Sequence, residues 1–146
     1  MFDLILVPLD GSKRAEAILP HIIALGQCLN SKVLLLQVIE PVLLPYDPQG
    51  YMPELDNERT QIRRGEANAY LESIAARLKN EGVEARVQVE EGAVVETILE
   101  IGEKEKARLI ALASHGRTGL KRAFYGSVAD GILNRVACPL LVVRSV

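Results

Sequence analysis

The chain alternates short apolar runs with longer segments in which apolar residues recur at helical spacing. Two of these runs, at 4–9 and 109–113, are apolar at consecutive positions, which is typical of strands covered by helices on both faces. Strands that alternate with helices indicate βαβ units, in which right-handed crossovers place helices on both sides of the sheet. We therefore expect an α/β fold, with an open five-stranded parallel sheet of the Rossmann-like type.

The same patterns place the other elements. Further strands are expected at 33–39, 83–90 and 139–144, and helices at 13–29, 54–80, 93–106 and 127–136. Val83 begins an alternation of apolar and charged residues that predicts a half-buried strand near an edge of the sheet. His21 and Ile62 fall on the apolar sides of the first two helices, so we expect His21 in a core or boundary position.

Composition limits the function classes. The 146 residues with 49% hydrophobic content predict one domain over 1–146. A net charge of -2 gives no field for nucleic acid or an anionic membrane, and 4% aromatic residues with no Trp cannot build a base-stacking surface. No targeting or membrane-spanning segment is expected, since Pro8 and Asp10 end the first apolar run. Two scattered cysteines favour a reducing cytoplasm.

Candidate site residues follow the first and fourth strands, because ligands of such sheets bind beyond the carboxyl ends of the strands. The first segment is Asp10-Gly11-Ser12, and the second runs from Ser114 to Gly126-Ser127, where a helix begins. Helix-start amides, a glycine and a hydroxyl suit a phosphate group. Positive charge on the same loop favours an anion, at Arg117, Lys121 and Arg122.

Each of these features also has a plain structural interpretation. Asp10 can form a turn, Ser12 can cap the first helix, and Gly126-Ser127 can be ordinary capping. His115 has no paired nucleophile, so we expect no catalytic residue. The spacing of histidines and cysteines fits no zinc site, so no metal ligands are expected. Walker and dinucleotide glycine motifs are absent, which disfavours P-loop and NAD functions.

The residues resemble a known family. Ala113-Ser114-His115-Gly116, then nine residues, then Gly126-Ser127 is similar to the nucleotide-binding signature G-2x-G-9x-G-(S/T) of the universal stress protein family. Three of the four fixed places match, and Ala113 stands where the pattern has its first glycine. The likeness extends to the segments 5–12 and 138–144 and to Val38, so it spans the whole chain.

This resemblance implies a Rossmann-like fold of the adenine nucleotide alpha hydrolase type and, in one branch of the family, ATP binding with Mg²⁺. Carried over residue by residue, adenine and ribose would be surrounded by Pro8, Asp10, Val38 and Leu112. Ribose and phosphates would be held by Ala113, Gly116, Gly126, Ser127 and Val128. The methyl group of Ala113 would matter if it faced the ligand and would be harmless if it pointed into the sheet.

The resemblance also implies a regulatory, non-enzymatic role and a homodimer formed through the last strand, whose apolar edge invites a second copy. Two other functions stay open: a nucleotide-free stress-response module that acts through protein partners, and a slow ATPase in which Asp10 or His115 orients water. The proline-rich interval at 41–53 is expected to be a flap over the ligand or a partner-contact loop.

Overall fold

The computed structural model describes residues 1–41, 53–115 and 126–145. The strands are β1 (Leu4–Pro8), β2 (Lys32–Ile39), β3 (Ala85–Glu91), β4 (Leu109–His115) and β5 (Leu140–Ser145). The helices are the 3-10 turn η1 (Ala15–Ile18), α1 (Leu19–Leu29), α2 (Pro53–Asn80), α3 (Val94–Lys104) and α4 (Gly126–Leu133). All neighbouring strands are parallel, in the order β3-β2-β1-β4-β5.

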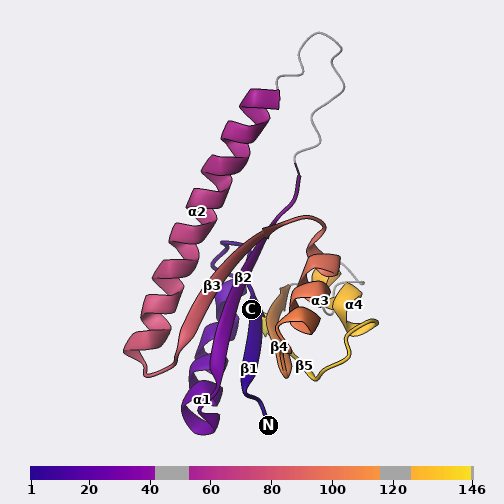
Figure 1. Ribbon diagram of the computed structural model, residues 1–146. Coiled ribbons are helices and arrows are strands. Elements are labelled where there is room, and N and C mark those ends of the chain that lie inside the picture. Colours follow the sequence, from indigo (N-terminus) through magenta and orange to yellow (C-terminus); the bar gives the residue numbers. More distant parts are fainter. Residues whose placement is uncertain (42–52, 116–125, 146) are drawn as a thin grey trace.

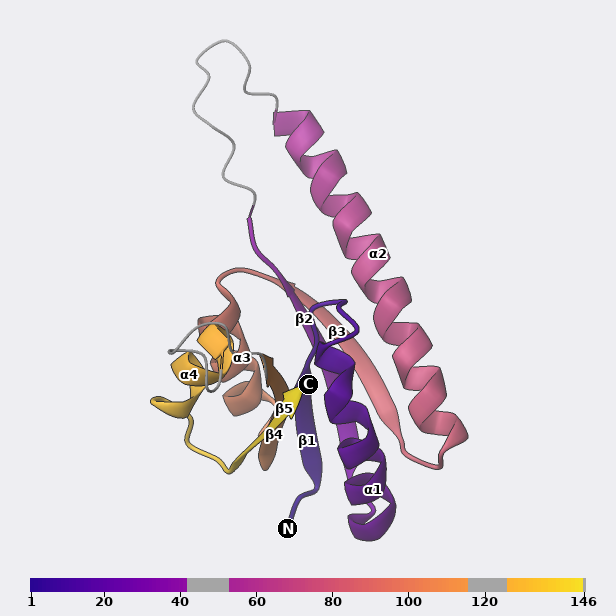
Figure 2. The same ribbon diagram turned by 180° about the vertical axis from the view of Figure 1, so that it is seen from behind.

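The expected fold is confirmed, with β1 at the centre and β3 and β5 at the two edges. Figures 1 and 2 show α1 and α2 on one face of the sheet and α3 and α4 on the other. Because side chains of a strand alternate between its faces, β1 supplies Ile5 and Val7 to the cluster under α1 and α2, and Leu6 to the cluster under α3 and α4. The sheet therefore has an aliphatic core on each of its two faces. Most of the proline-rich interval lies outside the described residues.

The first helix differs from the expectation at its start. It opens as the 3-10 turn η1 and becomes α-helical at Leu19, and the buried residues of α1 are Leu19, Ile22 and Gly26. His21 is exposed and so is Cys28. The placement of His21 in the core or at its boundary was therefore wrong. The tighter 3-10 winding offsets the two parts of the helix, and a single 3.6-residue period does not describe both.

The second helix extends past the sheet, as Figures 1 and 2 show. Its first buried side chain among the described ones is Ala67, and Ile62 is 60% exposed. Ile62 belongs to the apolar side of the predicted helix but is exposed, because a periodic apolar face is buried only where another element covers it. The part over the sheet is tied down by Arg64, whose guanidinium donates to the carboxylate of Glu91 at 2.8 Å and to the carbonyl of Val89 at 3.1 Å.

A polar clamp joins α2 to η1. The carboxylate of Glu16 accepts hydrogen bonds from the Tyr70 hydroxyl at 3.1 Å and from Arg77 at 2.9 Å, and its side chain is 12% exposed. Partial burial, and then the hydrogen bond to Glu16, raise the pKa of Tyr70 well above its usual value, so the phenol stays a donor at neutral pH. The clamp fixes the turn that follows β1.

Backbone hydrogen bonds show which way the residues of β1 face. The Asp3 carbonyl and the Leu9 N–H are bonded to β2, whereas the Leu4 carbonyl accepts from the N–H that precedes β4. In a strand the backbone groups of successive residues point to opposite neighbours, so the even-numbered residues of β1 face β4. Pro8 is one of them, and it has no N–H to donate.

The pairing of β1 with its two neighbours differs accordingly. β1 pairs with β2 from Leu4 to Pro8, but its register with β4 comprises Ile5 with Leu109 and Leu6 with Ile110. β4 nevertheless continues as a strand beyond this point. β1 and β4 therefore separate toward their carboxyl ends. They are also the two strands between which the order changes direction, since β2 and β3 follow on one side of β1 and β4 and β5 on the other. A crevice is expected at this switch point.

Two glycines in helices give a matched test of packing. A Cβ at Gly26 of α1 would lie 2.7 Å from Cγ1 of buried, β-branched Val83, whereas one at Gly65 of α2 would meet nothing within 4 Å. We expect Gly26→Ala to lower the free energy of unfolding by about 1–3 kcal/mol through overpacking. Gly65→Ala should raise it by roughly 0.5–1 kcal/mol. Urea unfolding measures both, and equal stabilities would contradict the packing of α1 on Val83.

Candidate functional site

A cavity of about 300 Å³ lies at the carboxyl ends of β1 and β4, where these strands diverge. Its walls come from both strands, from the end of β2, from the turn before η1 and from the starts of α3 and α4. The lining residues are Pro8, Leu9, Asp10, Arg14, Ala15, Leu36, Val38, Val94, Ile98, Leu112, Ala113, Ser127, Val128 and Ala129. This volume is at the lower end of the range of about 300–1,000 Å³ that is typical of small-molecule sites.

Most of the site residues expected from the sequence meet at this cavity. Seven of them line it, namely Pro8, Asp10, Val38, Leu112, Ala113, Ser127 and Val128. Gly126 is the first residue of α4, directly before Ser127. Gly116 lies outside the described residues, as do Arg117, Lys121 and Arg122. The structure therefore brings together the turn after β1 and the start of α4, which are more than a hundred positions apart in the chain.

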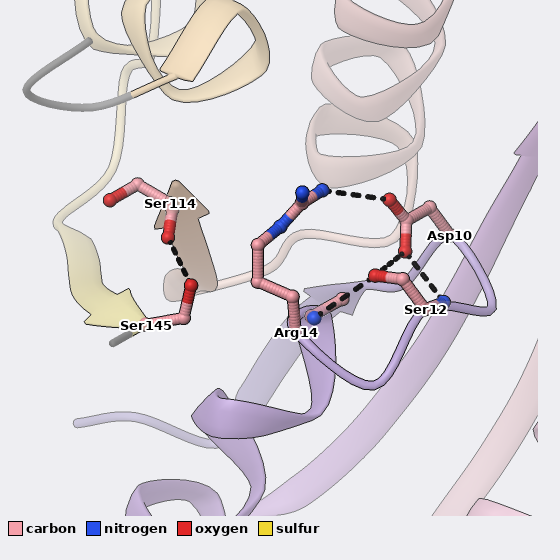
Figure 3. A network of polar contacts seen from close by, with 6 residues as sticks. Asp10, Ser12, Arg14, Ser114 and Ser145 are labelled. Carbon is pink, nitrogen blue, oxygen red and sulfur yellow. Dashed lines mark hydrogen bonds and ion pairs between the residues drawn. The ribbon is translucent and has the colours of Figure 1, made fainter. Parts of the chain in front are cut away.

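Asp10 occupies the turn that leaves β1. Its Oδ1 accepts hydrogen bonds from the Ser12 N–H at 2.9 Å and from the Ser12 hydroxyl at 2.6 Å, and the Ser12 Oγ accepts from the Ala15 N–H at 3.1 Å (Figure 3). Gly11 takes a φ of 86°, a left-handed conformation that glycine tolerates. The expected turn and capping roles of Asp10 and Ser12 are therefore present, although Ser12 caps the 3-10 turn.

The other oxygen of Asp10 has a different partner. Oδ2 lies 3.5 Å from Nη2 of Arg14, in an ion pair whose side chains are 58% and 39% exposed, respectively. Partial burial raises the pKa of Asp10, but the hydrogen bonds from Ser12 and the charge of Arg14 outweigh it, so the pKa lies below its usual value. Asp10 is a carboxylate at neutral pH, and an exposed pair of this kind contributes at most about 1 kcal/mol.

Sequence reasoning missed Arg14. It is the one basic side chain among the described residues that line the cavity, and Asp10 is the one acid. The signal was present, since an acid and a base four positions apart in a turn and a helix start can pair. It also missed Val94 and Ile98, which were assigned to an amphipathic helix without a link to the site. Their contribution depends on how α3 docks, which local patterns do not report.

Ala113 packs against the cluster under α1 and α2, whereas its neighbour Leu112 belongs to the cluster under α3 and α4. The methyl group therefore makes core contacts on the face of the sheet opposite α4, and Ala113 as a residue also lines the cavity. Across the end of the sheet, the Ser145 hydroxyl donates to the Ser114 carbonyl at 2.8 Å, which ties β5 to β4 (Figure 3).

The cavity lining has an apolar part and a polar part. Aliphatic side chains from β2, α3, β4 and α4 form an apolar slot, while Asp10, Arg14 and Ser127 supply polar groups at its border. A second hollow of about 460 Å³ adjoins the first and shares Asp10, Val38 and Val94 with it. Such a site suits a flat apolar ring system that carries hydroxyl and anionic groups.

No group of three or more His, Cys, Asp or Glu side chains in 1–41, 53–115 and 126–145 is arranged to hold a metal ion. Within the same part of the chain, no helix has the length and apolar character needed to cross a membrane.

Replacement of Ser12 by alanine tests the geometry of the turn. Ser12→Ala removes a donor to Asp10 and the cap of Ala15, so we expect a loss of about 1 kcal/mol in the free energy of unfolding. The pKa of Asp10 should rise toward its ordinary value. Because a lowered carboxyl pKa stabilises the fold above the unfolded pKa of about 3.9, this part of the loss should shrink as the pH falls below that value.

Carboxyl NMR titration and urea unfolding at several pH values measure these effects. Ser73→Ala is the matched control, because the exposed Ser73 hydroxyl donates to the Tyr70 carbonyl within α2 and not to Asp10. An unchanged Asp10 pKa in Ser12→Ala would contradict the assigned hydrogen bonds.

Comparison with known proteins adds to this geometry. The sequence profile of the universal stress protein family matches residues 1–144. Universal stress protein MJ0577 of Methanocaldococcus jannaschii is 30% identical over 155 residues, which cover 99% of this chain and 96% of that protein. Its solved structure has a TM-score of 0.83 and 31% identity, and the match covers 100% of this chain and 98% of that chain.

Two more distant solved structures share the fold. A universal stress protein in complex with cAMP has a TM-score of 0.71 at 19% identity, covering 99% of this chain and 98% of that one. A universal stress protein family protein from Arabidopsis thaliana with AMP bound has a TM-score of 0.69 at 15% identity, covering 98% and 92%. The family match reaches from the first strand to the last and includes every segment that lines the cavity, so this chain belongs to the universal stress protein family.

Proposed function

We propose that this protein is a regulatory module that binds an adenine nucleotide, ATP, in the cavity between β1 and β4. The observation that carries the proposal is the convergence of Asp10 and the start of α4 on one apolar slot. The cAMP and AMP complexes of structural relatives support an adenine nucleotide as the ligand class. The cavity and its adjoining hollow meet at Asp10, so a ligand longer than the first cavity has room to extend.

In this proposal, different residues contact the adenine, the ribose and the phosphates of the ligand. Adenine lies among aliphatic side chains, for which Val38, Leu112 and Val128 are the main candidates, because a flat ring gains dispersion energy from close packing. The carboxylate of Asp10 accepts hydrogen bonds from ribose hydroxyl groups. The amides at the start of α4, the Ser127 hydroxyl and the segment with Gly116 hold the phosphates. Since Ala113 packs on the opposite face from α4, its methyl group is compatible with this arrangement.

We propose that the protein is a binding module and not an enzyme. A general base works best with a pKa near the operating pH, and the pKa of Asp10 is lowered, which makes its carboxylate a weak base. Mg²⁺ would accompany the phosphates and keep several waters, since this ion needs few protein ligands. A slow ATPase remains the alternative within this proposal. We also propose the cytoplasm as the compartment, because Cys28 and Cys138 are free thiols.

A nucleotide-free module that acts through partners is the second candidate function. Ala113, in place of the first glycine of the signature, is the observation that favours it. The two candidates are separated by mass analysis of small molecules released from the purified protein by heat, followed by calorimetry with ATP and Mg²⁺. Absence of bound nucleotide together with absence of a heat signal would reject ATP binding.

A homodimer formed through β5 is also part of the proposal. β5 pairs with β4 on one side and is the last strand of the described sheet, and the side chains of 140–143 are half-buried. A half-buried apolar edge strand with its outer backbone groups unpaired within the described sheet is a surface that a second copy fits.

Removal of the Asp10 charge tests its role toward ribose. We expect Asp10→Asn to weaken adenosine binding by roughly tenfold, because a hydrogen bond to a carboxylate is stronger than one to an amide. The amide oxygen can still accept from Ser12, which preserves the turn. Calorimetric titration measures the affinity, with Asp130→Asn as the control because Asp130 is exposed on α4 and does not line the cavity. Equal affinities of Asp10→Asn and the wild type would contradict the assignment.

Light scattering at micromolar concentration tests the dimer. We expect a particle of twice the chain mass of 16.0 kDa, and we expect Leu141→Lys, which places a charge on the edge strand, to shift it toward the monomer. Circular dichroism of the variant checks that its sheet is intact. A single 16.0 kDa species of the wild type would contradict the proposal.

A further inference from the structure

We propose that Arg14 makes the site selective for phosphorylated ligands: it pairs with Asp10 when phosphate is absent and turns to the phosphate oxygens when a nucleotide binds. The inference rests on the proposed function, and it names which feature of the ligand this chain reads. Three observations support it: the position of Arg14, the charges of the residues that line the cavity, and the different partners of the two Asp10 carboxylate oxygens.

Arg14 is placed for such a contact. It directly precedes η1, and its side chain extends along the cavity border toward Asp10, with the end of β4 at Ser114 on its other side (Figure 3). The backbone under it is held, because Glu16 of η1 is clamped by Tyr70 and Arg77 of α2. The backbone that carries the guanidinium is therefore fixed, and the Arg14 side chain itself is 39% exposed.

The charge balance explains why this residue matters. The described lining carries one acid and one base, so its net charge is zero. A nucleotide that reaches both Asp10 and the start of α4 brings its phosphates near the carboxylate, and like charges at short range repel each other. A guanidinium that leaves Asp10 for the phosphate oxygens removes this conflict, and its planar fork fits such oxygens well.

Asp10 can lose this partner without losing its position. Oδ1 is held by two hydrogen bonds from Ser12, and Oδ2 faces Arg14. When Arg14 swings away, Oδ2 is available to a ribose hydroxyl, and Oδ1 keeps the carboxylate oriented. The pair itself opposes the exchange only weakly, since 3.5 Å is longer than the usual 2.7–2.9 Å of a charge-assisted hydrogen bond and both side chains are exposed.

The test compares adenosine with ATP in wild type, Arg14→Gln and Lys13→Gln. Lys13 is the matched control because it is the adjacent residue, is exposed, carries the same charge and does not line the cavity. We expect Arg14→Gln to lose roughly tenfold in ATP affinity, the ratio expected for one charge-assisted contact. Its adenosine affinity should stay the same or rise, because Oδ2 of Asp10 no longer faces Arg14. The salt dependence of ATP binding should weaken in the same variant. Lys13→Gln should bind both ligands as the wild type does.

The outcomes separate this inference from the proposed function. If the wild type binds neither adenosine nor ATP, the proposed function fails and the inference fails with it. If the wild type binds ATP and Arg14→Gln binds it equally well, the inference alone is overturned. An equal loss of adenosine and ATP affinity in Arg14→Gln would also overturn it, because that result indicates a structural role. Thermal unfolding of each variant shows whether the fold is retained.

Discussion

The separation of β1 from β4 at their carboxyl ends is the constraint on which the rest of the site depends. Parallel strands pair through backbone hydrogen bonds, and Pro8 lacks the N–H that its position would direct toward β4. Ile5 and Leu6 of β1 pair with β4. Beyond them both strands continue without a further pair between them. Residues of both aliphatic cores line the cavity at this position, among them Leu9 and Leu36.

The turn after β1 combines two roles that local reasoning presents as alternatives. Asp10 is a structural residue through Oδ1, because Ser12 holds it and in turn caps the 3-10 turn through Ala15. It also lines the cavity, and its Oδ2 lies 3.5 Å from Nη2 of Arg14. A carboxylate has two oxygens with separate lone pairs, so a cap and a ligand contact do not compete. The turn thereby preorganises the group that it contributes to the site.

Prediction from the sequence succeeded where one local cause dominates. Consecutive apolar residues placed β1 and β4 in the centre, and periodicity placed the helices within a few residues of their ends. It failed where packing chooses between equal local options. His21 and Ile62 share the spacing of buried neighbours, yet both are exposed. A 3-10 turn offsets His21 from the buried positions of α1, and Ile62 precedes Ala67, the first buried side chain described in α2.

The site shows the same division. The amino-acid sequence by itself determined the strand-helix alternation, the proline that ends the pairing of β1 with β4, and the family signature that marks Asp10 and Ser127, because each is a property of residue type and local order. Only the tertiary structure decided that Arg14, Val94 and Ile98 join the cavity and that the Ala113 methyl group packs on the face opposite α4. Those outcomes depend on how helices dock across a twisted sheet, and docking joins residues that are distant in the chain.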